Sequence, residues 1–235
     1  RDRLHPTKRL RPIAQGSVSP TAALWAAGVC VAASTFLAAV VSYREPYSTA
    51  RAFFWVAAAA YLLLNLGYSL GLKDRVILDV LLIALGFVLR VVAGCLAIPV
   101  DISPWLLVCT LLLALLLGLC KRRHEMALLE NGNHHTRRVL PHYTPELLNQ
   151  MISETTAAVL VSYMLYTFQP HLGRPNTDPR MMLTIPFVIY GVWRYQYLAY
   201  RHDMGGSPER AFRDRLFLLN GAMWVALVLL LTYWH

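Results

Sequence analysis

Long apolar runs constrain this chain more than any other feature of its sequence. Seven of them approach the roughly 20 residues that a helix needs to cross a bilayer. Hydrophobic residues make up 57% of the chain and charged residues only 15%, which is typical of a multi-pass membrane protein. The sequence therefore predicts an all-α, multi-span transmembrane helical bundle that forms a single domain over residues 1–235. The predicted spans are 20–41, 52–70, 76–99, 104–120, 147–168, 181–199 and 216–234.

The basic residues fall mostly on one side of these spans. Sixteen of the 22 Lys and Arg residues lie in segments 1–16, 71–75, 121–146 and 200–215, whereas the loops of the other side hold four. Cytoplasmic loops carry such an excess, so we predict that the first residue lies inside and His235 outside. The net charge of +9 has the same explanation, and no nucleic acid is expected as a partner. The four cysteines lack CxxC spacing and indicate neither a disulfide framework nor a metal site.

Two polar stretches on the predicted inner side, residues 1–16 and 68–79, are candidates for a functional site. The first holds five cations, one carboxylate and two prolines. Arg offers phosphate a planar fork of donors and Lys offers a point charge, so this stretch suits a densely anionic group. The second stretch is another polar break between two apolar runs. We interpret the two stretches as facing walls of one phosphate site.

Two charged residues, Asp79 and Arg90, lie in the third predicted span on nearly the same helix stripe as Gly86. A carboxylate is favourable near the start of a helix. Arg90 would lie roughly 16 Å deeper, where a guanidinium needs a partner inside the bundle. One interpretation is a cavity with Asp79 at its mouth and Arg90 deeper down. The alternative for Arg90 is a structural cation that pairs with helix carbonyls or another span.

The cations that follow the fourth span also have two interpretations. Lys121 and Arg122 belong either to the site or to a membrane anchor whose side chains reach the interface. His134 and His135 are adjacent in the next loop, which is poor spacing for two metal ligands.

Several of these motifs resemble the UbiA superfamily of intramembrane prenyltransferases. The stretch Asp2-Arg-x-His-Pro-x-Lys-x-x-Arg-Pro-Ile-Ala-x-Gly16 is similar to the end of the first Asp-rich motif of that family and the loop after it. Tyr68-Ser-x-x-Leu-Lys73, followed by Asp79, resembles the second motif of one branch, the decaprenyl-phosphate phosphoribosyltransferases. Three further segments resemble the same branch: Val88-Leu-Arg90-x-Val-Ala-Gly94, Lys121-Arg122 with Glu125, and Arg213-Asp214-Arg215.

The resemblance implies a fold of nine spans, so we expect the first two to precede Arg1 and seven to be present here. It also implies transfer of a phosphoribosyl group from phosphoribosyl diphosphate to a polyprenyl phosphate, with Mg²⁺, at the cytoplasmic face of the cell membrane. The partners are then the lipid substrate, the soluble donor and the bilayer, and a homo-oligomer is compatible with this reading. The implied catalytic residues are Asp2, Asp79 and Lys73, with Asp2 and Asp79 on the metal. The implied substrate-binding residues are Lys8, Arg9, Arg11, Tyr68, Arg90, Lys121 and Arg122.

Two other functions stay open at this point. The first is transfer of a prenyl group from a prenyl diphosphate to an aromatic or other small acceptor. The form of the second motif favours the phosphoribosyl branch instead. The second is a transporter or a non-catalytic membrane protein. Transporters place broken helices and their sites near mid-membrane, whereas the polar motifs here gather at one face.

The charge asymmetry makes a testable prediction about topology. A reporter fused after His235 should lie outside, and a reporter inserted in the loop 131–135 should lie inside, because the basic loops stay in the cytoplasm. Reporter activity in cells, measured with one reporter that works inside and one that works outside, checks both positions. The same side for both fusions would contradict the predicted number of spans.

Overall fold

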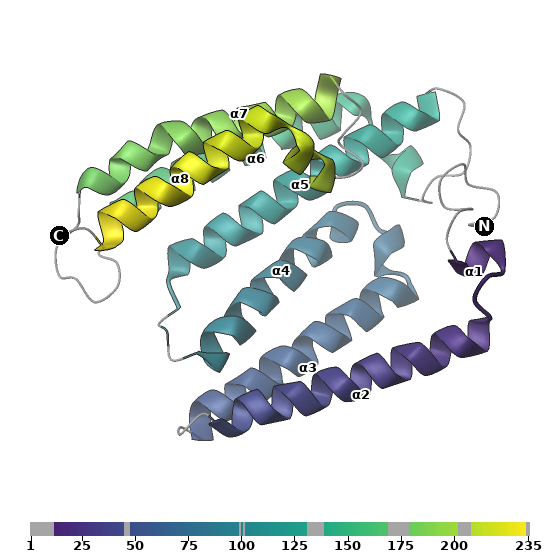
Figure 1. Cartoon of the computed structure of the whole chain (residues 1–235). Coiled ribbons are helices and arrows are strands. Elements are labelled where there is room, and N and C mark those ends of the chain that lie inside the picture. The colour runs from purple at the N-terminus through teal and green to yellow at the C-terminus, as the bar shows by residue number, and fades with distance from the viewer. Residues whose placement is uncertain are drawn as a thin grey trace.

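The structure, a computed structural model, describes residues 12–44, 48–98, 100, 102–130, 139–168, 179–201 and 208–233. All regular structure in these ranges is helical (Figure 1), which confirms the predicted all-α bundle. Each of the seven predicted spans coincides with one long helix. These helices are α2 (Pro20–Arg44), α3 (Ser48–Leu70), α4 (Leu78–Ala97), α5 (Pro104–Glu130), α6 (Pro145–Thr167), α7 (Ile185–Arg201) and α8 (Arg215–Tyr233). The short elements are α1 (Pro12–Gln15), η3 (Leu72–Asp74), η4 (Leu140–His142), η5 (Pro179–Thr184) and η7 (Pro208–Arg213).

Helix starts follow capping signals in the sequence. The side chain of Thr144 accepts a hydrogen bond from the Leu147 N–H at 3.2 Å, and Pro145 occupies the first turn of α6. Asp214 accepts from the Phe217 N–H at 2.8 Å and so caps α8. Such caps satisfy backbone donors that have no partner within the helix. A proline in the first turn loses nothing, because its missing N–H would have been unpaired.

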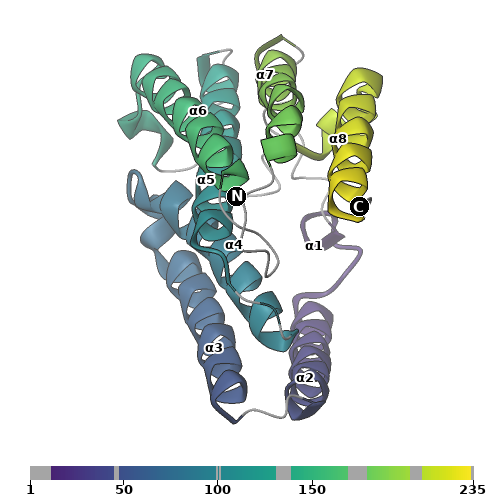
Figure 2. The same ribbon diagram turned by 90° about the vertical axis from the view of Figure 1, so that its left-hand side faces the viewer.

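The long helices pack mainly against their neighbours in the chain. In Figure 1, α4 lies between α3 and α5. Helix α6 packs along α5, and α7 and α8 pack as a pair with contacts to α6. Figure 2 shows α2 at the edge of the molecule, and its contacts with α3 are few. None of the residues in the most apolar stretch of α2 is buried by the described part of the chain.

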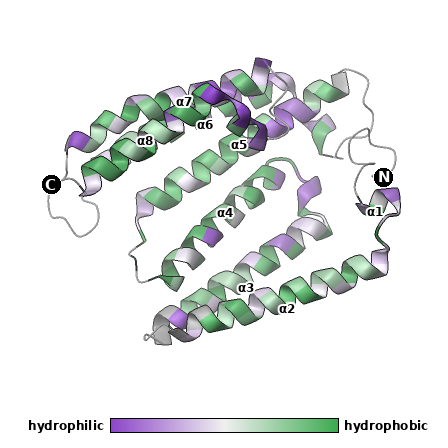
Figure 3. Ribbon diagram, viewed as in Figure 1, coloured by the Kyte–Doolittle hydropathy of each residue, from purple (hydrophilic) through white to green (hydrophobic). Residues whose placement is uncertain are grey.

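The buried core is concentrated at one end of the bundle. It lies where α4 and α6 begin and where α5 and α7 end, and η4 and η7 close it. This is the end predicted to face the cytoplasm. Figure 3 shows hydrophobic residues along the lengths of the long helices and hydrophilic residues in the elements at this end. The buried apolar residues there include Val80, Leu116, Leu119, Leu140, Leu148, Ile152, Leu198 and Ala211.

Five of the seven long helices are long and apolar enough to cross a membrane on length and composition alone, namely α2, α3, α4, α5 and α8. Helix α7 has only 17 residues, and both α6 and α7 carry several polar side chains toward the core end. That these two helices also cross stays a prediction. They run alongside α5 and α8 in Figure 1, and they form one hairpin in the chain order. The side predicted for the C-terminus is therefore the same whether or not the hairpin crosses.

The contact between α4 and α5 makes a stability prediction. A Cβ at Gly118 would lie 2.4 Å from Val80 Cγ1, whereas a Cβ at Gly94 would meet nothing within 4 Å. Gly118→Ala should therefore lower stability by about 1–3 kcal/mol through overpacking. Gly94→Ala, the matched control in α4, should be neutral or slightly stabilising because Ala is the better helix former. Thermal unfolding of both variants in detergent measures the difference. Equal midpoints would contradict the close approach of the two helices.

Candidate functional site

A fully buried ion pair joins α4 and α5 at the core end of the bundle. The Nε of Arg122 donates to Asp79 Oδ2 at 2.7 Å, and both side chains are 0% exposed. A second carboxylate, Glu125 on the next turn of α5, accepts from Arg122 Nη1. Taking charges out of water costs several kcal/mol per ion, so a buried Arg and Asp must stay paired. The positive charge of Arg122 is therefore balanced within the protein.

Tyr143 is the third member of this cluster. Its hydroxyl donates to Asp79 Oδ1 at 2.9 Å and accepts a hydrogen bond from the Ile77 N–H at 2.7 Å. Burial, first of all, raises the pKa of Tyr143 to about 12, the nearby charge of Asp79 adds to the rise, and the bond from Ile77 opposes it. The hydroxyl therefore keeps its proton near neutral pH and can go on donating to the carboxylate.

The turn between α3 and α4 carries Lys73 and ends in an unusual conformation. Ile77 has φ 69° and ψ −46°, and the Leu78 N–H donates to the Val76 carbonyl at 2.8 Å. These are the features of a classic γ-turn, which is rare and strained. A β-branched residue held at positive φ costs on the order of 1–3 kcal/mol, so surrounding contacts must maintain it. The hydrogen bond from Ile77 to Tyr143 is one such contact.

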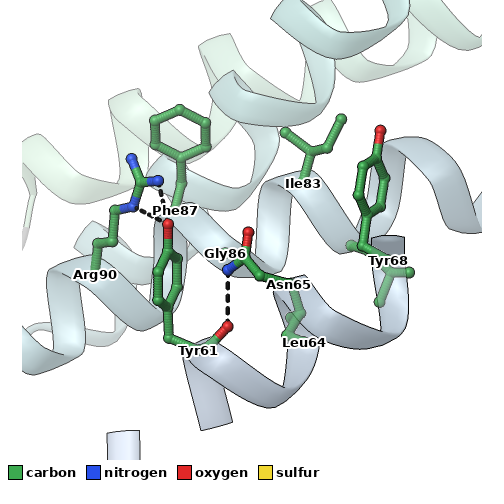
Figure 4. Close-up of a pocket in the computed structure, with 9 residues that line it drawn as sticks. Tyr61, Leu64, Asn65, Tyr68, Ile83, Gly86, Phe87 and Arg90 are labelled. Carbon is green, nitrogen blue, oxygen red and sulfur yellow. Dashed lines mark hydrogen bonds between the residues drawn. The ribbon is translucent and has the colours of Figure 1, made fainter. Parts of the chain in front are cut away.

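A groove of about 100 Å³ lies between α3 and α4, farther along the helices. Arg90 donates from Nε and Nη2 to the Tyr61 hydroxyl, and its guanidinium carbon lies 5.0 Å from the Tyr61 ring centre. Figure 4 shows this pair at one end of the groove and Tyr68 at the other, with Asn65 between them on α3. The groove is small beside the 300–1,000 Å³ of typical ligand sites. Arg90 thus pairs with a neighbouring span, as one of its two interpretations expected.

The structure divides the residues predicted for the site into two groups. Asp79 and Arg122 meet in the buried pair, with half-buried Lys73 on the turn before Asp79 and half-buried Lys121 beside Arg122. Tyr68 and Arg90 line the groove instead. Asp79 does not line this groove, so the described residues do not form the expected cavity with Asp79 at its mouth and Arg90 deeper down. The other predicted residues, Asp2, Lys8, Arg9 and Arg11, lie outside the described residues, as do His134 and His135.

The described residues alone do not fit a metal site. Within the described ranges, no three His, Cys, Asp or Glu side chains group closely enough to hold an ion. Both carboxylate oxygens of Asp79 already accept hydrogen bonds, and the side chain is buried. The metal role of Asp79 stays a prediction, and in this arrangement it would require the carboxylate to release Arg122 or Tyr143. The role predicted for Asp2 falls in the segment that is not described.

Sequence reasoning missed the two tyrosines that organise these groups. Tyr61 lies inside an apolar span, where nothing in its neighbourhood marks it as the partner of Arg90, 29 positions away. Tyr143 offered a weak signal. It follows Val139 and Leu140 in a mostly polar loop and directly precedes the Thr144 cap of α6. Apolar and aromatic residues next to a helix start favour a loop end that is packed onto the protein.

Known proteins resemble this chain over nearly its full length. Residues 1–221 match the UbiA prenyltransferase family. The decaprenyl-phosphate phosphoribosyltransferase of Corynebacterium glutamicum is 30% identical over 233 residues, which are 99% of this chain and 68% of the relative. The enzyme of the same name from Mycolicibacterium smegmatis is 30% identical over 97% of this chain and 70% of its own length. That of Mycobacterium tuberculosis is 29% identical over 97% of this chain and 71% of its length.

The buried pair makes a prediction that a double-mutant cycle tests. Asp79→Asn and Arg122→Gln should each lower the free energy of unfolding by about 3–5 kcal/mol, because each leaves a buried charge with one partner fewer. Together they should cost less than the sum, by about 1 kcal/mol or more. Exposed Arg210→Gln is the control and should change stability by no more than about 0.5 kcal/mol. Unfolding in detergent measures all four variants. Strictly additive losses would contradict the pairing.

Proposed function

Because its match to the family spans residues 1–221, the chain belongs to the UbiA prenyltransferase family, and we propose that it moves a phosphoribosyl group from phosphoribosyl diphosphate to a polyprenyl phosphate. It is a transferase of that family and a multi-pass membrane protein. One observation carries the proposal: relatives about 30% identical over nearly the whole chain bear the name decaprenyl-phosphate phosphoribosyltransferase. Decaprenyl phosphate is accordingly the acceptor that we propose.

The proposed reaction exchanges one bond at the ribose for another. The bond from C1 to the diphosphate oxygen breaks, and a bond from C1 to an oxygen of the prenyl phosphate forms. Diphosphate leaves, and the ribose becomes oxocarbenium-like in between. No covalent enzyme nucleophile is needed. What the protein must supply is orientation of the two substrates and positive groups placed where charge develops on the leaving diphosphate.

The cations of the core end have different parts in this proposal. Lys73 is half-buried on the turn before Asp79, and half-buried Lys121 directly precedes Arg122, so we assign both lysines to the donor's phosphates. Lys8, Arg9 and Arg11 join them as proposed phosphate ligands from the segment that is not described. The positive charge of Arg122 is balanced by two carboxylates, so we propose that Arg122 positions other groups and does not bind the donor's phosphates directly. We assign Arg90 and Tyr68 to the lipid substrate, since their groove lies between α3 and α4, two helices that are long and apolar enough to cross a membrane.

We place the site at the cytoplasmic face of the cell membrane. The support is the excess of Lys and Arg on the side where the core end, Lys73 and Lys121 lie. Mg²⁺ remains the proposed cofactor, with Asp2 and Asp79 as its predicted ligands. No catalytic step is assigned to it, because the described residues do not form a metal site.

The family match also favours one other reaction, transfer of a prenyl group from a prenyl diphosphate to a small acceptor. Incubating membranes that contain the full-length protein with labelled phosphoribosyl diphosphate, and separately with labelled prenyl diphosphate, distinguishes the two. Label entering the lipid fraction from phosphoribosyl diphosphate alone supports the proposal. Transfer only from prenyl diphosphate would replace it with the second reaction.

The roles of the cations make a kinetic prediction. In the full-length protein, Lys73→Gln and Arg11→Gln should each raise the KM for phosphoribosyl diphosphate at least tenfold, which corresponds to about 1.4 kcal/mol. The KM for the prenyl phosphate should change less, because burial of its tail is unaltered. Arg210→Gln, an exposed cation on the same predicted side, is the control. Both constants are measured in detergent with equal amounts of folded enzyme. Equal small losses for both substrates would show that these cations only anchor the protein in the membrane.

A further inference from the structure

Tyr143 is the only described tyrosine whose hydroxyl joins a backbone amide of the Lys73 turn to a buried carboxylate. We propose that Tyr143 is a positioning residue. Its hydrogen bond to the Ile77 N–H, which we call the latch, holds the strained turn in place and thereby fixes the position of Lys73 relative to a phosphorylated donor. The inference rests on the proposed function for the identity of that donor. The latch itself follows from the contacts of the turn.

The hydroxyl of Tyr143 is oriented by the ion pair behind it. A tyrosine hydroxyl has one proton to donate, and here Asp79 Oδ1 takes it. The lone pairs of the hydroxyl oxygen then face the Ile77 N–H, which donates to it at 2.7 Å. Arg122 holds the other oxygen of the carboxylate and so keeps it aimed. The hydrogen bonds therefore form one chain from Arg122 on α5 through Asp79 on α4 and Tyr143 to the turn at Ile77, and each bond supports the next.

The strained residue lies where the turn meets α4. A γ-turn with a β-branched residue at its centre is not a conformation that the chain adopts by itself. At the other end of the turn, Leu72 packs on α3, with its Cδ1 3.2 Å from where a Cβ of Gly67 would stand. Lys73 lies between these two anchors, one residue from Leu72 and four from Ile77. If the downstream anchor is released, Ile77 can relax to negative φ and the path of the chain past Lys73 changes.

In this proposal Asp79 has a positioning role that does not require a metal. Its two oxygens serve Arg122 and Tyr143, and the carboxylate acts on the donor through the turn rather than by contact. A positioning role and a metal role differ in what they predict. Loss of a metal ligand shifts the dependence of activity on metal concentration, whereas loss of the latch shifts the donor constant and leaves the metal dependence unchanged.

The test compares two Tyr→Phe variants of the full-length protein. Tyr143→Phe removes the latch hydroxyl and keeps the ring. Tyr163→Phe is the matched control, because its hydroxyl also makes two side-chain bonds, to Thr184 and from Trp224, but lies toward the other end of α6. Hydrogen exchange of the peptide 71–79 should become at least tenfold faster in Tyr143→Phe and stay unchanged in Tyr163→Phe. This readout requires no activity, so unchanged exchange in Tyr143→Phe overturns the latch whatever the reaction is.

Kinetics then test the positioning of the donor. Tyr143→Phe should raise the KM for phosphoribosyl diphosphate about tenfold, with less than a twofold change in the KM for prenyl phosphate and in the metal activation curve. Adding Ile77→Gly should restore the donor KM to within about threefold, because glycine adopts positive φ without strain. Faster exchange with an unchanged donor KM, a shifted metal curve, or no rescue by Ile77→Gly overturns the inference. Absence of phosphoribosyl transfer by the unmodified protein instead overturns the proposed function, and the exchange data still decide the latch.

Discussion

The core end of the bundle depends on the buried pair between Arg122 and Asp79. Two ions without access to water are tolerable only while they stay bonded to one another and to further polar groups. Meeting that condition fixes how α4 and α5 lie against each other, at the level where Gly118 lets Val80 approach closely. It also draws in Tyr143 and with it the end of the loop before α6. The apolar core surrounds this cluster, so packing and charge pairing specify the same arrangement.

Toward the end of the bundle opposite the core, the helices have few buried residues. The outer lengths of the helices bury few residues, because apolar side chains gain little by leaving lipid for protein. Hydrogen bonds between helices help to hold the bundle together there. Trp224 donates to the Tyr163 hydroxyl at 2.9 Å, and Asn220 donates to the Phe187 carbonyl at 2.9 Å. The bundle is therefore tightly packed at the end where we propose the charged donor binds and has few buried residues along the rest of its length.

The sequence was sufficient for the helices but not for their polar contacts. Long apolar runs with capping signals such as Thr144-Pro145 predict where helices form, because backbone polar groups in a bilayer must be satisfied within the segment. The partner of a polar residue depends on packing between segments. The sequence therefore suggested that the Asp79 carboxylate lies near water. In the structure it is buried and paired with Arg122, 43 positions later in the chain. In the same way, the sequence gives no sign that Arg90 turns to Tyr61 rather than to a cavity shared with Asp79.

The described cations of the core end differ in whether carboxylates balance their charge. A cation that is already neutralised by two carboxylates, as Arg122 is, adds little net attraction for a diphosphate. Its contribution is rigidity, since a functional group held by packed and hydrogen-bonded neighbours is placed more precisely than one on a free loop. In the proposed function, attraction for the diphosphate comes from other cations, and Lys73 is the cation whose position we propose the Tyr143 network determines. In the proposed site, Arg122 therefore helps to keep side chains in position, whereas Lys73 supplies the positive charge that attracts the donor.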